Sequence, residues 1–182
     1  MCETFVMSVT LLCSDNVSVT VALPVARMSN IVRELMESTE DGSDAPIPLA
    51  NVSSSMLARA IAYCELYRVP DNEEAVTLAR KEAETACTLP LPWGMSAWEE
   101  QFFHVAKADA LSMDDLLQDV RTANYLHVQP MLEAACLAVA RRLPRTAEKI
   151  RELFGIECDF TKEELEQIQE ENAWLDENTR AT

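Results

Sequence analysis

The sequence predicts a mixed α/β (α+β) fold, with a small sheet and helices in the N-terminal half and helices alone in the C-terminal half. Residues 17–23 alternate between apolar and polar or small side chains, which is typical of a half-buried strand. After the segment 88–94, which contains Pro and Gly, apolar residues recur three and four positions apart, as on one face of a helix. The 182 residues, 48% of them apolar, suffice for one core-bearing domain and a small annex.

The first elements are predicted from turn and cap residues. Residues 5–23 should form a β-hairpin, because Ser14-Asp15-Asn16 favours a turn between two apolar segments. Ser29 is expected to cap the helix that follows. The acidic segment 37–46 is predicted to be a loop, and Ile47-Pro48-Leu49 to be extended, because proline disfavours helix at the residue before it.

The middle of the chain carries weaker helical signals. Ser53 or Ser54 should open a helix with apolar residues at helical spacing. Residues 73–87 have good helix propensity but a thin apolar stripe, and a further helix is predicted over 98–105.

Four later helices are predicted from their ends. Ser112 can cap the first, and Pro130 occupies the first turn of the second. The third should stop at Gly155. Thr161 and Glu164 form a capping box that starts the fourth, over residues 161–177.

Charge and composition exclude several functions. Asp and Glu number 31 against 15 Lys and Arg, which gives a net charge of −16. Such a chain repels nucleic acid and anionic membranes, so neither is expected as a partner. The three glycines are far apart, so no glycine-rich nucleotide-binding loop is present. No signal peptide or membrane-spanning segment is expected.

Neither a metal, a cofactor, a small-molecule substrate nor a catalytic site is expected. The six cysteines contain no C-x-x-C pair, and the two histidines lack a second ligand at helical spacing. We expect reduced thiols and a cytoplasmic and nuclear location. The acidic pairs Asp114-Asp115 and Glu163-Glu164 fall in first turns of predicted helices, where they complement the helix dipole. His104 and His127 have no neighbour in sequence that would orient them as bases.

Two clusters remain open between alternatives. Trp174, eight residues from the C-terminus, could belong to a local core or anchor a partner protein. The basic residues of 141–151 could meet an acidic partner or form internal salt bridges.

Several short motifs follow one another in the order found in the S-phase kinase-associated protein one family, which this chain resembles along nearly its whole length. One of them is Ala123-Asn124-Tyr125-Leu126, which is similar to the A-N-Y-L signature of the family. The others include Ser14-Asp15, Ile47-Pro48-Leu49, Asn51-Val52, Ala62-Tyr63-Cys64, Trp98 with Phe102, Asp159-Phe160-Thr161 with Glu163-Glu164, and Glu171-Asn172 with Trp174.

The resemblance implies two domains and a non-catalytic role. A BTB/POZ domain, with a small sheet packed by helices, would span residues 1–128 and contain a divergent linker or insertion at 68–97. A helical extension that binds F-box motifs would span 129–177, followed by a tail at 178–182. Family members are adaptors of SCF (cullin–RING) E3 ubiquitin ligases, which bridge F-box substrate receptors to the N-terminal region of a cullin for protein ubiquitination.

The resemblance also assigns contact residues. Asn124 and Tyr125, together with the acidic loop 37–46, should bind the cullin. The F-box side should involve Leu117, Cys136, Val139, Ile156 and Trp174. The chain departs from the family at His127, where Asp is usual, and in extra residues near 106–111, which bear on the position of Leu117.

Two other functions stay open. The same fold could serve as a structural F-box-protein-binding subunit of a non-ligase assembly, such as a kinetochore-like or proton-pump-regulating complex. It could also act as a BTB homo-oligomeric scaffold. Loss of cullin binding would favour the first, and a monomeric mass would exclude the second.

Overall fold

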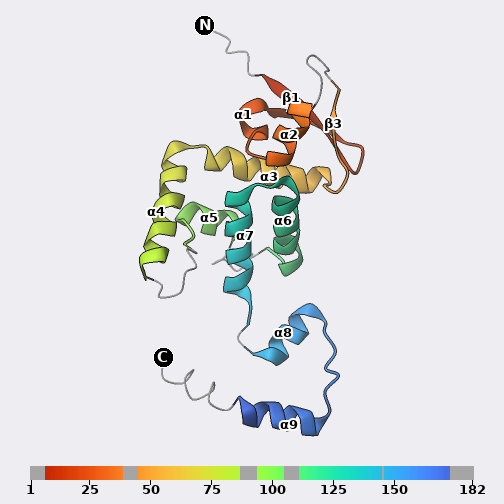
Figure 1. Ribbon diagram of the computed structural model, residues 1–182, viewed down its shortest axis with the longest axis vertical. Coiled ribbons are helices and arrows are strands. Elements are labelled where there is room, and N and C mark those ends of the chain that lie inside the picture. Colours follow the sequence, from red (N-terminus) through yellow and green to blue (C-terminus); the bar gives the residue numbers. More distant parts are fainter. Residues whose placement is uncertain (1–6, 39–44, 87–93, 105–110, 145, 173–182) are drawn as a thin grey trace. The chain divides into compact units, whose positions relative to one another are not determined.

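The computed structural model describes residues 7–38, 45–86, 94–104, 111–144 and 146–172, which form three strands and nine helices (Figure 1). The chain divides into two compact units, Met1–Arg142 and Leu143–Thr182. The predicted combination of a small sheet with helices, followed by helices alone, is confirmed.

The sheet is built on the predicted hairpin. Strands β1 (Ser8–Cys13) and β2 (Ser18–Ala22) pair antiparallel, and β3 (Ile47–Leu49) pairs parallel to β1, in the order β2-β1-β3. Leu11 of β1 lies opposite Val19 of β2 and Ile47 of β3, so one face of the sheet is apolar. That face packs into the core of the first unit.

Helix α3 lies between the sheet and the neighbouring helices α6 and α7 (Figure 1). Helices α4 and α5 lie beside this arrangement. The bounds of the helices in this unit are α1 Leu23–Ala26, α2 Asn30–Ser38, α3 Ser54–Tyr67, α4 Pro70–Ala86, α5 Ala97–Phe102, α6 Met113–Leu126 and α7 Gln129–Arg142.

The predicted helix caps are confirmed, because capping depends on local chemistry. Ser53 Oγ accepts a hydrogen bond from the Met56 backbone amide at 3.4 Å. Ser112 and Asp115 form a reciprocal capping box at the start of α6. Ser29 Oγ accepts from the backbone amide of Val32 at 3.2 Å, and it also donates to the Leu126 carbonyl at 2.6 Å. The Ser29 hydroxyl therefore joins the start of α2 to the end of α6.

Three predicted boundaries shift. The helix predicted over 98–105 ends at Phe102, and His104 adopts the left-handed conformation with φ +51°. The helix predicted at 73–87 begins three residues earlier, at Pro70. Helix α2 extends to Ser38, inside the predicted acidic loop, and residues 39–44 of that loop lie outside the described residues.

A bidentate ion pair joins α3 to α6. Arg59 Nε and Nη2 donate to the two carboxylate oxygens of Asp119 at 2.8 and 2.6 Å. The Asp119 side chain is 4% exposed and the Arg59 side chain 34% exposed. The guanidinium carbon also lies 5.1 Å from the centre of the Phe102 ring, so the same side chain contacts α5. This geometry compensates the charge of a carboxylate that lies almost wholly inside the protein.

Glu99 is buried beside an aromatic cluster, and both oxygens of its carboxylate accept hydrogen bonds. Its Oε2 accepts from the backbone amide and hydroxyl of Ser96 at 2.9 and 2.8 Å, and its Oε1 accepts from the Tyr63 hydroxyl at 2.8 Å. The Tyr63 ring lies 5.2 Å from that of Trp98 and 5.5 Å from that of Phe102. These contacts fix α5 against α3 without leaving the carboxylate unpaired.

Part of the basic cluster 141–151 has an internal role. Arg141 forms an ion pair with Glu100, and Arg142 donates to the backbone carbonyl of Leu111. Both contacts hold the end of α7 against neighbouring parts of the first unit. Arg145 lies outside the described residues.

The second unit contains α8 (Ala147–Phe154) and α9 (Lys162–Glu171). Helix α8 ends at Gly155, whose φ of +62° is the left-handed conformation that glycine adopts without strain. Helix α9 begins with the predicted capping box between Thr161 and Glu164.

We expect Arg59→Met to lower the free energy of unfolding by about 2–4 kcal/mol, because it leaves the buried Asp119 carboxylate without its cation. The expected loss of unfolding free energy is somewhat smaller than for a fully buried ion pair, because a third of the Arg59 side chain is exposed. Chemical denaturation of the full chain measures the change.

The matched control is Arg141→Met, which removes a cation from an ion pair that is exposed on both sides. That change should alter the free energy of unfolding by about 0.5 kcal/mol or less. Equal effects of the two substitutions would contradict the role given to Arg59.

Candidate functional site

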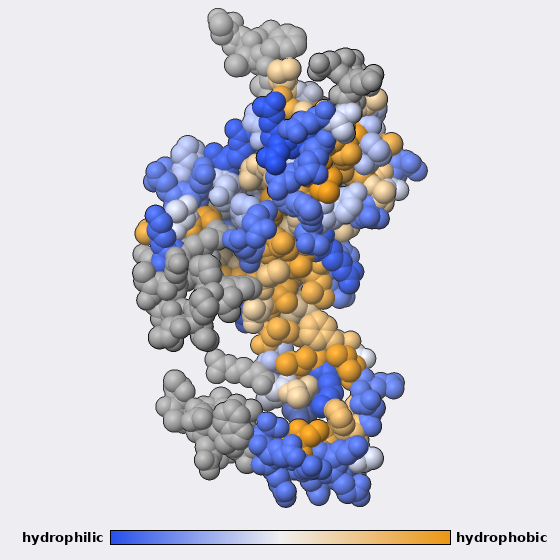
Figure 2. All heavy atoms as spheres, in the orientation of Figure 1, coloured by the Kyte–Doolittle hydropathy of each residue, from blue (hydrophilic) through white to orange (hydrophobic). Residues whose placement is uncertain are grey.

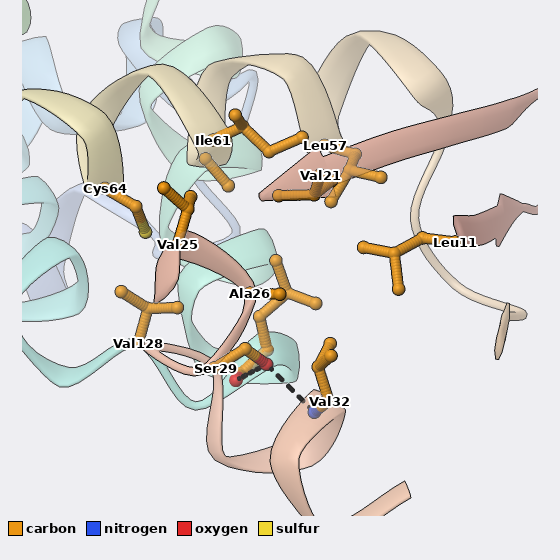
Figure 3. Close-up of a pocket in the computed structure, with 12 residues that line it drawn as sticks. Leu11, Val21, Val25, Ala26, Ser29, Val32, Leu57, Ile61, Cys64 and Val128 are labelled. Atoms are coloured by element: carbon orange, nitrogen blue, oxygen red, sulfur yellow. Dashed lines mark hydrogen bonds between the residues drawn. The ribbon is translucent and has the colours of Figure 1, made fainter. Parts of the chain in front are cut away.

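One apolar cavity in the described part of the first unit is too small for a substrate. It measures about 20 Å³ and lies between the sheet, α1 and α3 (Figure 3). Ser29 reaches this cavity, but its hydroxyl is already hydrogen-bonded to Val32 and Leu126. Burial raises the pKa of the Cys64 thiol, which also lines the cavity, to about 12, so the reactive thiolate is scarce at neutral pH.

The acidic pairs lie in first helical turns, as predicted. Asp114 and Asp115 belong to the first turn of α6, and Glu163 and Glu164 to that of α9. Hydrogen bonds from Ser112 lower the pKa of Asp115, and those from Thr161 lower the pKa of Glu164. Both carboxyl groups therefore stay ionised and serve as caps.

The two histidines take structural positions at helix ends. His127 caps the C-terminus of α6 in the left-handed conformation, with φ +50°. His104 follows α5, and its Nδ1 is buried without a hydrogen-bond partner among the described residues. No group of three or more metal-ligating side chains occurs in the part of the chain that the structure describes. None of its helices combines the length and the apolar character needed to cross a membrane.

The predicted cullin-side residues occupy the last turn of α6. Asn124 is exposed, and Tyr125 is half-buried against the core. The next residue, Leu126, is buried, and its carbonyl oxygen accepts the hydrogen bond from Ser29. The backbone of this turn is thus held in place while Asn124 and part of Tyr125 remain accessible.

The predicted F-box-side residues are divided between the two units. Leu117 lies on α6, and Cys136 and Val139 lie on the neighbouring helix α7, all three half-buried. Burial raises the pKa of the Cys136 thiol. Ile156 follows α8 in the second unit and is exposed, and Trp174 lies outside the described residues.

The second unit leaves most of its described large apolar side chains exposed. No residue of α8 is buried, and none of the α9 residues whose side chains are described is buried either. Hydrophobic residues, which are orange in Figure 2, are visible at the surface of this unit. Five large apolar side chains are between 39% and 56% exposed: Leu153, Phe154, Ile156, Phe160 and Ile168.

Those five residues define the apolar surface of the second unit. Of the five, the family resemblance assigns only Ile156 to the F-box side. For Leu153 and Phe154 the sequence signal was their helical spacing with Ile150, which predicts an apolar face but does not say what covers it. The structure shows that nothing within the second unit buries this face. Exposed apolar patches of this kind mark protein-binding sites.

Two family models match the chain. The Skp1 family tetramerisation domain matches residues 7–69, and the Skp1 family dimerisation domain matches residues 129–175.

Curated relatives match over almost the full length of both chains. The E3 ubiquitin ligase complex SCF subunit sconC of Talaromyces stipitatus is 31% identical over 170 residues, which cover 93% of this chain and 97% of the relative. Suppressor of kinetochore protein 1 of Schizosaccharomyces pombe is 31% identical over 92% of this chain and 96% of its own length. The S-phase kinase-associated protein 1 homolog of Tetrahymena thermophila is 31% identical over 94% of this chain and 95% of its own. Together with the confirmed fold, these matches establish that the chain belongs to the Skp1 family.

Proposed function

We propose that this chain is the non-catalytic adaptor of an SCF E3 ubiquitin ligase, in which it joins F-box substrate receptors to a cullin. Relatives that match over nearly their whole length are named as SCF subunits. The structural observation that carries the proposal is the apolar surface of the second unit, which the unit itself does not bury. An F-box protein is the partner that covers this surface.

Binding of the F-box protein would be driven by burial of that surface. Leu153, Phe154 and Ile156 lie within four residues of one another, so one partner helix can cover all three. Aromatic and aliphatic side chains at the centre of such a contact supply most of its affinity. Cys136, Val139 and Leu117 are further contacts in this proposal, and Trp174 is the remaining aromatic anchor.

The cullin would bind a separate surface. Asn124 and Tyr125 lie at the exposed end of α6, a helix that is anchored in the core of the first unit. The acidic segment 37–46 is assigned to the same contact by family resemblance. An adaptor with two separate surfaces can hold both partners at once, and this role needs no reacting group, cofactor or small-molecule substrate.

The domain assignment is part of the proposal. The BTB/POZ domain would span residues 1–128, and the F-box-binding extension 129–177. Helix α7 opens the extension and packs beside α6 in the first unit, so the extension begins on a rigid element. The cytoplasm and nucleus are the proposed locations, as the cysteine spacing in the sequence indicates.

A second candidate function is a structural subunit that binds F-box proteins outside a ligase. One relative is named suppressor of kinetochore protein 1, and this name supports a structural role as the second candidate function. Affinity purification of the tagged chain with mass spectrometry tests both functions. A cullin recovered together with several F-box proteins supports the ligase, and F-box proteins without any cullin support the alternative.

Tyr125→Lys should weaken cullin association by about tenfold or more while F-box binding persists. The substitution places a charge where a half-buried ring meets the proposed partner, and desolvating an unpaired charge is costly. Titration of the variant with a cullin N-terminal domain, and separately with an F-box domain, measures both affinities. Loss of both with an unchanged melting temperature would contradict the two-surface arrangement.

Phe154→Ser should weaken F-box binding by roughly 30-fold, which corresponds to about 2 kcal/mol for an aromatic anchor. The melting temperature should change little, because Phe154 is 41% exposed and not part of a core.

The matched control is Glu152→Ser, which alters an exposed residue on the opposite face of the same helix. Its affinity for the F-box domain should stay within about twofold of the unaltered chain. An unchanged affinity of Phe154→Ser, with a large fall in melting temperature, would mean that Phe154 serves the chain's own stability.

A further inference from the structure

Helix α8 presents its apolar face between two cations. Ile150, Leu153 and Phe154 share one side of the helix, and the 100° rotation per residue places Lys149 and Arg151 at the two edges of that side. Lys149 is exposed and makes no ion pair or hydrogen bond within the described part of the chain. The Arg151 guanidinium carbon lies 5.8 Å from the centre of the Phe160 ring, so this cation is held beside an exposed apolar side chain.

Helix α9 presents the opposite charge. Its apolar stripe consists of Leu165 and Ile168, and the same rotation places Glu164 and Glu171 along one edge and Lys162 along the other. The ten residues of α9 contain five glutamates and one lysine. Hydrogen bonds from Thr161 lower the pKa of Glu164 and keep it ionised near neutral pH. The apolar side of α8 is therefore bordered by two cations, and one edge of the α9 stripe is bordered by two glutamates.

We propose that the F-box segments that bind this chain are matched to this charge pattern, with lysine or arginine beside α9 and a carboxylate beside Lys149 of α8. This inference rests on the proposed function and adds the property by which the chain selects among F-box proteins. Charges at the edge of an interface steer encounter and reject partners of like charge, whereas the apolar centre supplies most of the affinity. The net charge of −16 strengthens the attraction for a basic segment at long range.

The test uses one recombinant F-box domain in two forms with the same apolar residues. One form carries lysines at the edge that meets α9, and the other carries glutamates there. Association rates with the full-length chain are measured by stopped-flow at 50 and 500 mM NaCl. The lysine form should associate about tenfold faster at 50 mM, and the difference should shrink at 500 mM because salt screens charges beyond about 4 Å.

Substitutions in the chain identify the groups responsible. Glu171→Lys, at the edge of the α9 stripe, should slow association of the lysine form by about threefold to tenfold and speed that of the glutamate form. Glu152→Lys changes the net charge equally but lies on the face of α8 opposite the apolar side chains, so it should have a much smaller effect. Lys149→Glu should slow association of a domain that carries a carboxylate beside α8. Circular dichroism of each variant confirms that α8 and α9 remain folded.

The outcomes separate this inference from the function on which it rests. If neither form of the domain binds the unaltered chain, both are overturned. If both forms bind, but Glu171→Lys and Glu152→Lys have equal effects, the charge match alone is overturned. If the free chain has a doubled mass and Glu171→Lys restores the single mass, this surface binds a second copy of the chain, and the charge match is also overturned.

Discussion

The contact between α3 and α6 organises the first unit. Arg59 pairs with both oxygens of Asp119 across this contact, and the same guanidinium lies against Phe102 of α5. One side chain thus links three helices that are distant in sequence. Ser29 adds a second link, from the start of α2 to the end of α6. With α6 fixed in this way, its last turn presents Asn124 and Tyr125 in a defined position for the proposed cullin contact.

The second unit has well-capped helices but no buried core among its described residues. Its helices have well-formed ends, with a capping box at Thr161 and a left-handed glycine at residue 155, yet neither helix has a described residue that is buried. Caps specify where a helix begins and ends, but short helices gain most of their stability from packing. A partner that covers the apolar surface would therefore stabilise α8 and α9 while it binds.

Local chemistry accounts for what could be predicted from the sequence. Serine and threonine caps at residues 29, 53, 112 and 161 mark helix starts, because the capping hydrogen bonds span only three residues. Long-range pairs left no such signal. Arg59 and Asp119 are 60 residues apart in the sequence. In the sequence Glu99 looks like any acidic residue in a first helical turn, and only the fold shows that the Tyr63 hydroxyl donates a hydrogen bond to it. Similarly, the spacing of Leu153 and Phe154 predicts an apolar face on α8. Whether that face is exposed depends on which other helices or strands pack against it.

Hydrogen–deuterium exchange of the full-length chain, alone and with a saturating F-box domain, tests the central claim that the second unit completes its apolar packing on a partner. We expect backbone amides of α3 and α6 to exchange slowly in both states, because their residues form the buried core. Amides of α8 and α9 should exchange quickly in the free chain and slow markedly in the complex. Slow exchange of α8 and α9 in the free chain, unchanged by the F-box domain, would contradict the claim.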